Sequence, residues 1–237
     1  AVDLQNGNLI DPYRGQEDLQ NNVLRSVRPE ALSEDPLRVV RALVARGRHG
    51  LNPDDTTRYQ MGQFAHSLEH LPAERIKEEL DKLFKSDDPA GAIRLARETG
   101  TLKHILPEVD ACMGFNQNNP HHQQELGDHL LSVLEYTAQK SDDPDLRLAA
   151  LLHDIGKPAS AWVDPDTGKN HYYLKKYEDG RTVGAMHEEV GADMTEKLMD
   201  RLRYPKDRTK RVSDLVRHHM WKAFTTDRGA RKFLNRV

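Results

Sequence analysis

The sequence predicts a mostly α-helical protein. From Leu37 onward, apolar residues recur with the helical period, and β character is confined to residues 1–28 and to a segment near residues 162–183. The 237 residues suffice for a sizeable core. Because only 37% of the residues are hydrophobic and 31% are charged, we expect elongated helical layers with much solvated surface.

Composition excludes several classes of protein. A net charge of −3 predicts no general attraction to nucleic acid, although short basic stretches occur. The single cysteine, Cys112, excludes an internal disulfide framework and is typical of a reducing cytoplasm, where we expect the protein to reside. No apolar run approaches the roughly 20 residues of a membrane span, and no signal peptide is visible. We therefore expect no membrane partner, and nothing in the sequence indicates a particular oligomeric state.

The β signal of residues 1–28 predicts a small sheet remnant. Val2 and Leu4 alternate with polar residues, Asn6-Gly7 is typical of a hairpin turn, and Leu9-Ile10 resumes the apolar pattern.

Residues 29–115 form a predicted helical body. One helix opens at Leu37, with Ser33 or Asp35 as its N-cap and Pro36 in its first turn. Three more helices are predicted after Asp54-Asp55-Thr56, after Leu71-Pro72 and from Asp88-Pro89 to Gly100, and a short apolar stretch over 102–109 is broken by Pro107.

A polar, turn-rich segment at 116–120 marks the predicted domain boundary. The second domain, 116–237, should hold four or five helices, one of them reading from Asp145 to Ile155. A hairpin interrupts them at 162–183, with its turn at 164–168 and strand character at Tyr172 and Tyr173.

The strongest functional signal is a set of histidines with one aspartate. Four predicted helices each carry a histidine on the apolar stripe: His129, His153, His187 and His219, with Asp154 beside His153. Imidazole nitrogen combined with carboxylate oxygen suits Mn²⁺, Fe²⁺, Co²⁺, Ni²⁺ or Mg²⁺. A single inward histidine is more often a core residue bonded to a backbone carbonyl, but four that converge on an aspartate favour a divalent metal site. His49, His66, His70, His104 and His171 lack this pattern and are interpreted as surface or core residues.

These residues resemble a known signature. His129, His153-Asp154 and a late aspartate, Asp227, are similar to the H…HD…D pattern of HD-domain phosphohydrolases. Asn119-Pro120-His121-His122, the block 148–158, His187-Glu188 with Gly191-Ala192, and Leu215-Val216 with His219-Met220 resemble the HD domain of bacterial CCA-adding tRNA nucleotidyltransferases. Met186 stands where that family usually has glycine.

The resemblance implies metal-assisted hydrolysis of a phosphoester. His129, His153, Asp154 and Asp227 would bind the ion, while His187 and His219 would complete a second metal position or stabilise phosphate charge. Lys157 would act beside His153 and Asp154 by neutralising a phosphate oxygen, and His122 is a second candidate for binding phosphate. An equally good interpretation of Lys157 is a cation that faces a helix C-terminus, and His122 has a similar ambiguity.

The first half resembles the same family. Residues 9–13 with Gly15 and Asp18-Leu19 are similar to the motif that closes the nucleotidyltransferase palm, so the resemblance makes 1–28 a palm remnant. The segment Glu34 to Arg38 with Arg41 resembles the EDxxR nucleotide-reading motif, and Glu74-Arg75-Ile76 with Glu79-Leu80 resembles the neck motif that follows. This implies nucleotide contacts from Asp35, Arg38 and Arg41, because a carboxylate and a guanidinium can match the edge of a base. Taken alone, residues 34–38 are more typical of a capped helix start with solvated charges.

Three functions follow as hypotheses. The first is a hydrolase for 2′,3′-cyclic phosphates, 2′-nucleotides or similar small phosphoesters, with the tRNA 3′ end as a partner. The second is a body that binds tRNA and nucleotides without hydrolysis. The third is part of a nucleotidyltransferase; residues 1–28 lack the Gly-Gly turn and the Asp-x-Asp pair that the transferase requires, so we expect no nucleotide addition and only weak binding of ATP or CTP.

Overall fold

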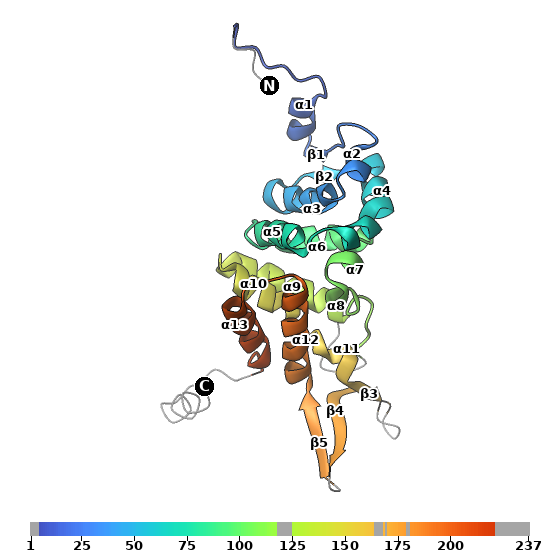
Figure 1. Cartoon of the computed structure of the whole chain (residues 1–237), viewed down its shortest axis with the longest axis vertical. Coiled ribbons are helices and arrows are strands. Elements are labelled where there is room, and N and C mark those ends of the chain that lie inside the picture. The colour runs from blue at the N-terminus through green and yellow to red at the C-terminus, as the bar shows by residue number, and fades with distance from the viewer. Residues whose placement is uncertain (1–4, 118–124, 164–167, 169, 179–180, 221–237) are drawn as a thin grey trace.

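The structure is a computed structural model that describes residues 5–117, 125–163, 168, 170–178 and 181–220. Helices stack in successive layers along the long axis, from α1 near one end to a β-sheet at the other (Figure 1). The mostly α-helical fold predicted from the sequence is confirmed. No helix within the described ranges is long and apolar enough to cross a membrane.

The N-terminal β signal survives only in part. Gly7 has a φ of 73°, as the predicted turn requires, and Leu9 forms an isolated bridge. Residues 1–4, which carry the first half of the predicted hairpin, lie outside the described residues.

A helix that the sequence did not predict follows this turn. α1 (Gly15–Gln20) begins where the carboxylate of Asp11 accepts hydrogen bonds from the N–H groups of Gly15 and Gln16, each at 2.8 Å. This side-chain cap satisfies donors that the first helical turn leaves free. The alternating pattern around the Asn6-Gly7 turn gave no indication of it.

The helical body is built from short amphipathic helices and also contains one parallel pair of two-residue strands. Its elements are β1 (Val23–Leu24), α2 (Ala31–Glu34), α3 (Leu37–His49), β2 (Asn52–Pro53), α4 (Asp55–Phe64), the 3₁₀ helix η1 (Ala65–His70), α5 (Ala73–Phe84), α6 (Pro89–Glu98), α7 (Leu102–Ile105) and α8 (Pro107–Asp110). The side chains of Asp54 and Asp88 cap α4 and α6. Neither Ser33 nor Asp35 caps α3, which begins directly after Pro36 without a side-chain cap.

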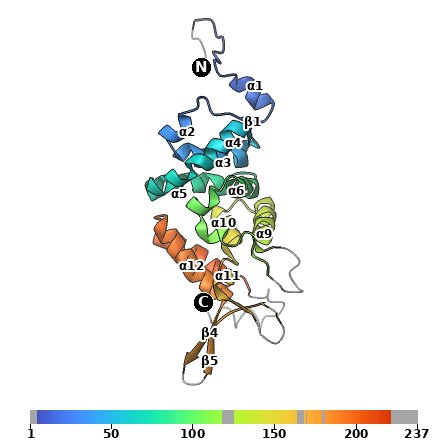
Figure 2. The same cartoon turned by 90° about the vertical axis from the view of Figure 1, so that its right-hand side faces the viewer.

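The described residues of the second half contain five helices, in agreement with the four or five predicted. They are α9 (Leu126–Lys140), α10 (Pro144–Leu152), α11 (Gly156–Ser160), α12 (His187–Arg201) and α13 (Lys206–Arg217). α12 and α13 pack against each other and lie beneath α9 and α10 in Figure 1, and α12 again lies below α10 in the perpendicular view of Figure 2.

The predicted hairpin corresponds to the first two strands of a three-stranded antiparallel sheet. β3 (Ala161–Val163) pairs with β4 (Asn170–Glu178), which pairs with β5 (Arg181–Met186). The sequence analysis missed β5, although Asp179-Gly180 between β4 and β5 is a dipeptide typical of two-residue hairpin turns. β5 leads directly into α12, which begins at His187.

One hydrophobic core runs through both halves of the chain. Its buried residues form one cluster in space, whose members range from Ala31 to Val216 and come from both sides of the predicted boundary at 116–120. The buried guanidinium of Arg147 on α10 donates to the carbonyl oxygens of Phe84 and Ser86 at 3.0 and 2.9 Å, and so ties the second half to the end of α5. The division into residues 29–115 and 116–237 remains a prediction.

Candidate metal centre

Asp154 is the centre of the site. It lies in the turn between α10 and α11, and only 4% of its side chain is exposed. Gly156 makes this position compatible with α12: a Cβ on Gly156 would stand 2.2 Å from the carbonyl oxygen of His187 and 2.5 Å from the amide nitrogen of Gly191. The close approach that only glycine permits brings His187 next to Asp154.

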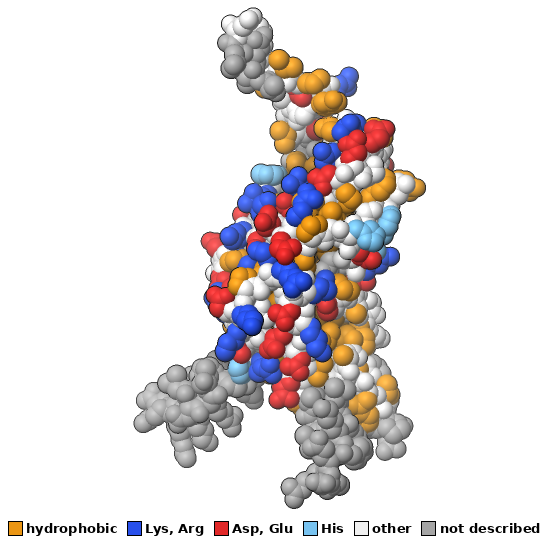
Figure 3. All heavy atoms as spheres, in the orientation of Figure 1, with side chains coloured by type: hydrophobic (Ala, Val, Ile, Leu, Met, Phe, Trp, Pro, Cys, Tyr) orange, Lys and Arg blue, Asp and Glu red, His pale blue; other side chains and the backbone are white. Residues whose placement is uncertain are grey.

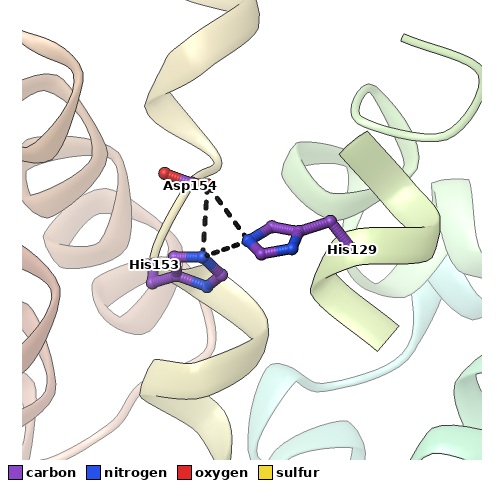
Figure 4. Close-up of side chains that lie close together, drawn as sticks. All are labelled: His129, His153 and Asp154. Atoms are coloured by element: carbon purple, nitrogen blue, oxygen red, sulfur yellow. Dashed lines mark hydrogen bonds and ion pairs between the residues drawn. The ribbon is translucent and has the colours of Figure 1, made fainter. Parts of the chain in front are cut away.

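One side of Asp154 faces His129 and His153. Oδ2 lies 3.2 Å from Nε2 of His153 and 3.6 Å from Nε2 of His129, and the two Nε2 atoms are 3.1 Å apart. His129 projects from α9 and His153 follows the end of α10, so two elements supply three candidate ligand atoms (Figure 4).

The other carboxylate oxygen faces the remaining two histidines. Oδ1 of Asp154 lies 3.2 Å from Nε2 of His187, at the start of α12, and 3.4 Å from Nε2 of His219, just past α13. Within the described residues, Asp154 therefore belongs to two groups that could each hold an ion, one with His129 and His153 and one with His187 and His219.

Partners on the opposite ring nitrogens orient three of these imidazoles. Nδ1 of His153 lies 2.8 Å from the carbonyl oxygen of Ala150, and Nδ1 of His219 lies 2.7 Å from that of Val216. Nδ1 of His187 lies 3.3 Å from the carboxylate of Glu188. A proton on each Nδ1 leaves Nε2 as the lone-pair atom that points at Asp154, which is the tautomer that metal-binding histidines use.

The charges of the site are coupled. Burial alone would raise the pKa of Asp154, but contacts with His153, His187 and His219 outweigh it and hold that pKa far below its usual range. Burial would lower the pKa of His219, and the carboxylate of Asp154 together with the Val216 carbonyl raises it instead.

The residues fit a divalent cation. Oδ1 of Asp154 and Nε2 of His187 and of His219 are buried and form no hydrogen bond of good geometry within the described part of the chain. Buried polar atoms without such partners are costly, and an ion that accepts their lone pairs would remove that cost. Neutral nitrogen and carboxylate oxygen donors without a thiolate suit Mn²⁺, Co²⁺, Ni²⁺ or Mg²⁺.

Lys157 lies in the same centre. Its Nζ is 2.7 Å from Oδ2 of Asp154 and 3.0 Å from Oε1 of Gln117, and its side chain is 5% exposed. It therefore neutralises a buried carboxylate rather than merely facing a helix end in solvent. Sequence reasoning missed Gln117, because nothing in its polar, turn-rich segment distinguishes it from the neighbouring amides.

The apolar stripes that carry His153 and His219 are only partly buried. Leu146 and Leu215, which lie on these stripes, are 37% and 36% exposed. Ala149 and Val212, at the other positions of the same stripes, are buried. His122 and Asp227 lie outside the described residues.

The three residues predicted to bind nucleotide lie about the start of α3. The carboxylate of Asp35 is 3.4 Å from Arg75 and 3.8 Å from Arg41, and Arg38 donates to the carbonyl oxygen of Ala31 at 3.0 Å. Arg38 and Arg41 line a cavity of about 370 Å³ together with Arg25.

Two family models match the chain. That of the HD domain covers residues 126–232, which include the whole histidine cluster, and that of the probable RNA and SrmB-binding site of polymerase A covers residues 50–113. The class defined by the fold and the site is thus a helical body joined to an HD domain.

Curated relatives identify the family more closely. The chain is 34% identical over its full length to an A-adding tRNA nucleotidyltransferase of Deinococcus radiodurans, of which it covers 53%, and 37% identical over 90% of its length to a Multifunctional CCA protein of Chromobacterium violaceum, of which it covers 49%. It therefore spans about half the length of the curated relatives it matches. The chain belongs to the bacterial CCA-adding tRNA nucleotidyltransferase family and corresponds to its C-terminal part.

Solved structures share the fold. A structure described as tRNA-processing enzyme complex 3 aligns with 98% of this chain and 51% of its own, with a TM-score of 0.55 at 18% identity. A CCA-adding enzyme of Thermotoga maritima complexed with tRNA aligns with 90% of this chain and 42% of its own, with a TM-score of 0.52 at 18% identity.

Proposed function

We propose that this chain is a metal-dependent phosphohydrolase. The observation that carries the proposal is the convergence of His129, His153, His187 and His219, from four separate helical segments, on the buried carboxylate of Asp154. A core histidine needs only a backbone carbonyl to be satisfied. Here His153 and His219 have that carbonyl at Nδ1 and still direct Nε2 at the carboxylate of Asp154, which His187 also contacts through Nε2.

The residues have distinct roles in this reaction. A bound divalent ion would supply a water of lowered pKa and polarise a phosphoryl oxygen. Asp154 supplies negative charge to hold the ion, and the Nε2 atoms supply neutral ligands. The ammonium of Lys157, 2.7 Å from Asp154, can neutralise the charge that develops on a phosphoryl oxygen.

The substrate class follows from the family. Relatives are named A-adding tRNA nucleotidyltransferase and Multifunctional CCA protein, and this supports phosphoesters of RNA as the substrate class: we propose 2′,3′-cyclic phosphates, 2′-nucleotides and similar small phosphoesters. Mn²⁺, Co²⁺, Ni²⁺ and Mg²⁺ are the ions that the donor set favours.

The test measures hydrolysis of bis(p-nitrophenyl) phosphate and of 2′,3′-cyclic AMP with each of these ions in turn. Asp154→Ala and His153→Ala should abolish turnover and metal binding while circular dichroism still shows folded helices, because each removes a ligand rather than an outer contact. His49→Ala, on the exposed end of α3, should change neither. Full activity in Asp154→Ala, or no turnover of the unmodified chain with any of the four ions, would refute the hydrolase.

A second candidate function is a body that binds tRNA and nucleotides without hydrolysis. The match of residues 50–113 to an RNA-binding family model favours it, as does the cavity lined by Arg25, Arg38 and Arg41. It predicts tRNA binding that Asp154→Ala leaves unchanged, together with weak ATP or CTP binding that Arg38→Ala removes. Fluorescence anisotropy with labelled tRNA and with labelled nucleotides distinguishes it from the hydrolase.

A further inference from the structure

The buried ammonium of Lys157 poses a problem for any metal at Asp154. Nζ lies 2.7 Å from Oδ2, which is also the oxygen nearest His129 and His153. If Oδ2 of Asp154 is to bind an ion, the Lys157 ammonium needs another hydrogen-bond acceptor, because an unpaired buried cation strongly raises the free energy of the folded protein.

Gln117 is placed to be that acceptor. Its side chain comes from the segment between α8 and α9, far from Lys157 in sequence, and the residue is 1% exposed. Its Oε1 accepts from Nζ at 3.0 Å. The hydroxyl of Tyr172 on β4 donates to the backbone carbonyl of Gln117, and the Tyr172 ring centroid lies 5.5 Å from Nζ. Three parts of the chain therefore enclose one ammonium.

We propose that Gln117 is a positioning residue of the metal centre, which acts by holding the Lys157 ammonium so that Asp154 is free to bind a divalent cation. This inference rests on the metal site of the proposed function and adds a residue to it. Tyr172 supports Gln117 through the backbone and so joins the three-stranded sheet to the centre.

The matched variants make a double-mutant cycle. Gln117→Leu keeps the bulk of the side chain but removes the acceptor, and it should weaken Mn²⁺ binding by about 10-fold or more, the range of outer-contact changes at metal sites. Lys157→Met removes the ammonium and should leave Mn²⁺ affinity unchanged or stronger. In the Lys157→Met background, Gln117→Leu should have no further effect on affinity, because there is no cation left to hold.

Two further variants separate positioning from packing. Gln117→Glu keeps an oxygen acceptor and should retain Mn²⁺ affinity. Gln60→Leu removes another buried glutamine, which lies on α4 and donates its amide N–H to the Pro29 carbonyl. This variant should lower thermal stability without changing Mn²⁺ affinity.

Isothermal titration calorimetry of the full chain with Mn²⁺ gives the dissociation constants, and thermal melting without metal shows that each variant is folded. Equal losses from Gln117→Leu with and without Lys157, or a Gln117→Glu variant as weak as Gln117→Leu, would overturn the proposal, as would a chain that binds no Mn²⁺. Mn²⁺ binding with the expected cycle but without turnover would refute the hydrolase and leave the role of Gln117 intact.

Discussion

Arg147 on α10 connects the two halves of the chain through a buried guanidinium. Only 2% of it is exposed, and besides the Phe84 and Ser86 carbonyls its guanidinium donates to the carbonyls of Ala138 and Ser141. A guanidinium has five N–H donors in a planar fork, so it can satisfy the ends of several helices at once.

Arg147→Met should therefore destabilise the protein by about 2–6 kcal/mol, because the buried carbonyl oxygens of Phe84 and Ser86 lose their donor at about 1–3 kcal/mol each. Urea unfolding followed by circular dichroism measures the change. Arg94→Met, which removes an exposed ion pair with Glu135, is the control and should cost at most about 1 kcal/mol. A similar loss in both variants would contradict the role given to Arg147.

Cys112 offers a second prediction at the residue scale. Burial is the main cause that raises the pKa of its thiol to about 12, and the nearby Asp154 carboxylate adds to it. Because the raised pKa favours the protonated thiol, the reactive thiolate should be scarce at pH 8 and should grow only as the pH rises toward 12.

Since Cys112 is the sole cysteine, a thiol reagent such as Ellman's reagent reports on it directly. Labelling at pH 8 should be roughly 1000-fold slower in the native protein than in denaturant, because each unit of pKa changes the thiolate fraction tenfold. Rapid native labelling would show that the segment around Cys112 opens readily.

At the scale of elements, the contact between α11 and α12 decides whether His187 reaches Asp154. A Cβ on Gly156 would meet backbone atoms of α12 at 2.2 and 2.5 Å, and backbone cannot turn aside as a flexible side chain can. The position of His187 beside Asp154 thus depends on Gly156, a residue whose side chain takes no part in metal binding.

Gly156→Ala should push α12 away, lower stability by about 1–3 kcal/mol through overpacking, and weaken Mn²⁺ binding at least as much as an outer-contact change does, about 10–100-fold. Calorimetry and thermal melting measure both effects. Gly15→Ala is the control, since its Cβ would meet only the Asp11 carboxylate at 3.4 Å. Unchanged metal affinity in Gly156→Ala would show that His187 does not depend on this contact.

At the scale of the whole molecule, ion pairs and the continuous core join the halves. Arg208 on α13 contacts Asp81 on α5 at 2.6 Å and also the carboxylate of Asp145 on α10, while Arg211 contacts Asp145 at 2.9 Å. Figure 3 shows basic and acidic side chains interspersed over one face of the stacked helices. Such networks add to the apolar core rather than replace it.

We therefore expect both halves to unfold in one cooperative transition. Both tryptophans, Trp162 and Trp221, belong to the second half, whereas circular dichroism reports helices of both. Urea curves from tryptophan fluorescence and from circular dichroism should coincide, and Arg208→Leu should move both to lower urea by the same amount. Two separate midpoints would instead favour independent domains divided at 116–120.

The helical class, most helix starts and the four histidines that gather around Asp154 can be predicted from the amino-acid sequence without a structure. Helical periodicity and local caps such as Asp54 and Asp88 depend on neighbours within a few residues, so they can be read without a structure. Asp154 beside His153, at the end of an apolar helix, is likewise a local pattern. Local patterns did not indicate α1, whose first turn is bonded to the carboxylate of Asp11, or β5, which is positioned by its antiparallel pairing with β4.

The arrangement of these residues around Asp154 depends instead on how distant helices pack against one another. The assignment of His129 and His153 to one carboxylate oxygen and of His187 and His219 to the other depends on how α9, α10, α12 and α13 pack. The burial of Lys157 and its contact with Gln117 depend on a segment 40 residues away along the chain. Such contacts leave no periodic trace in the sequence, because they are set by where packed helices bring distant side chains together.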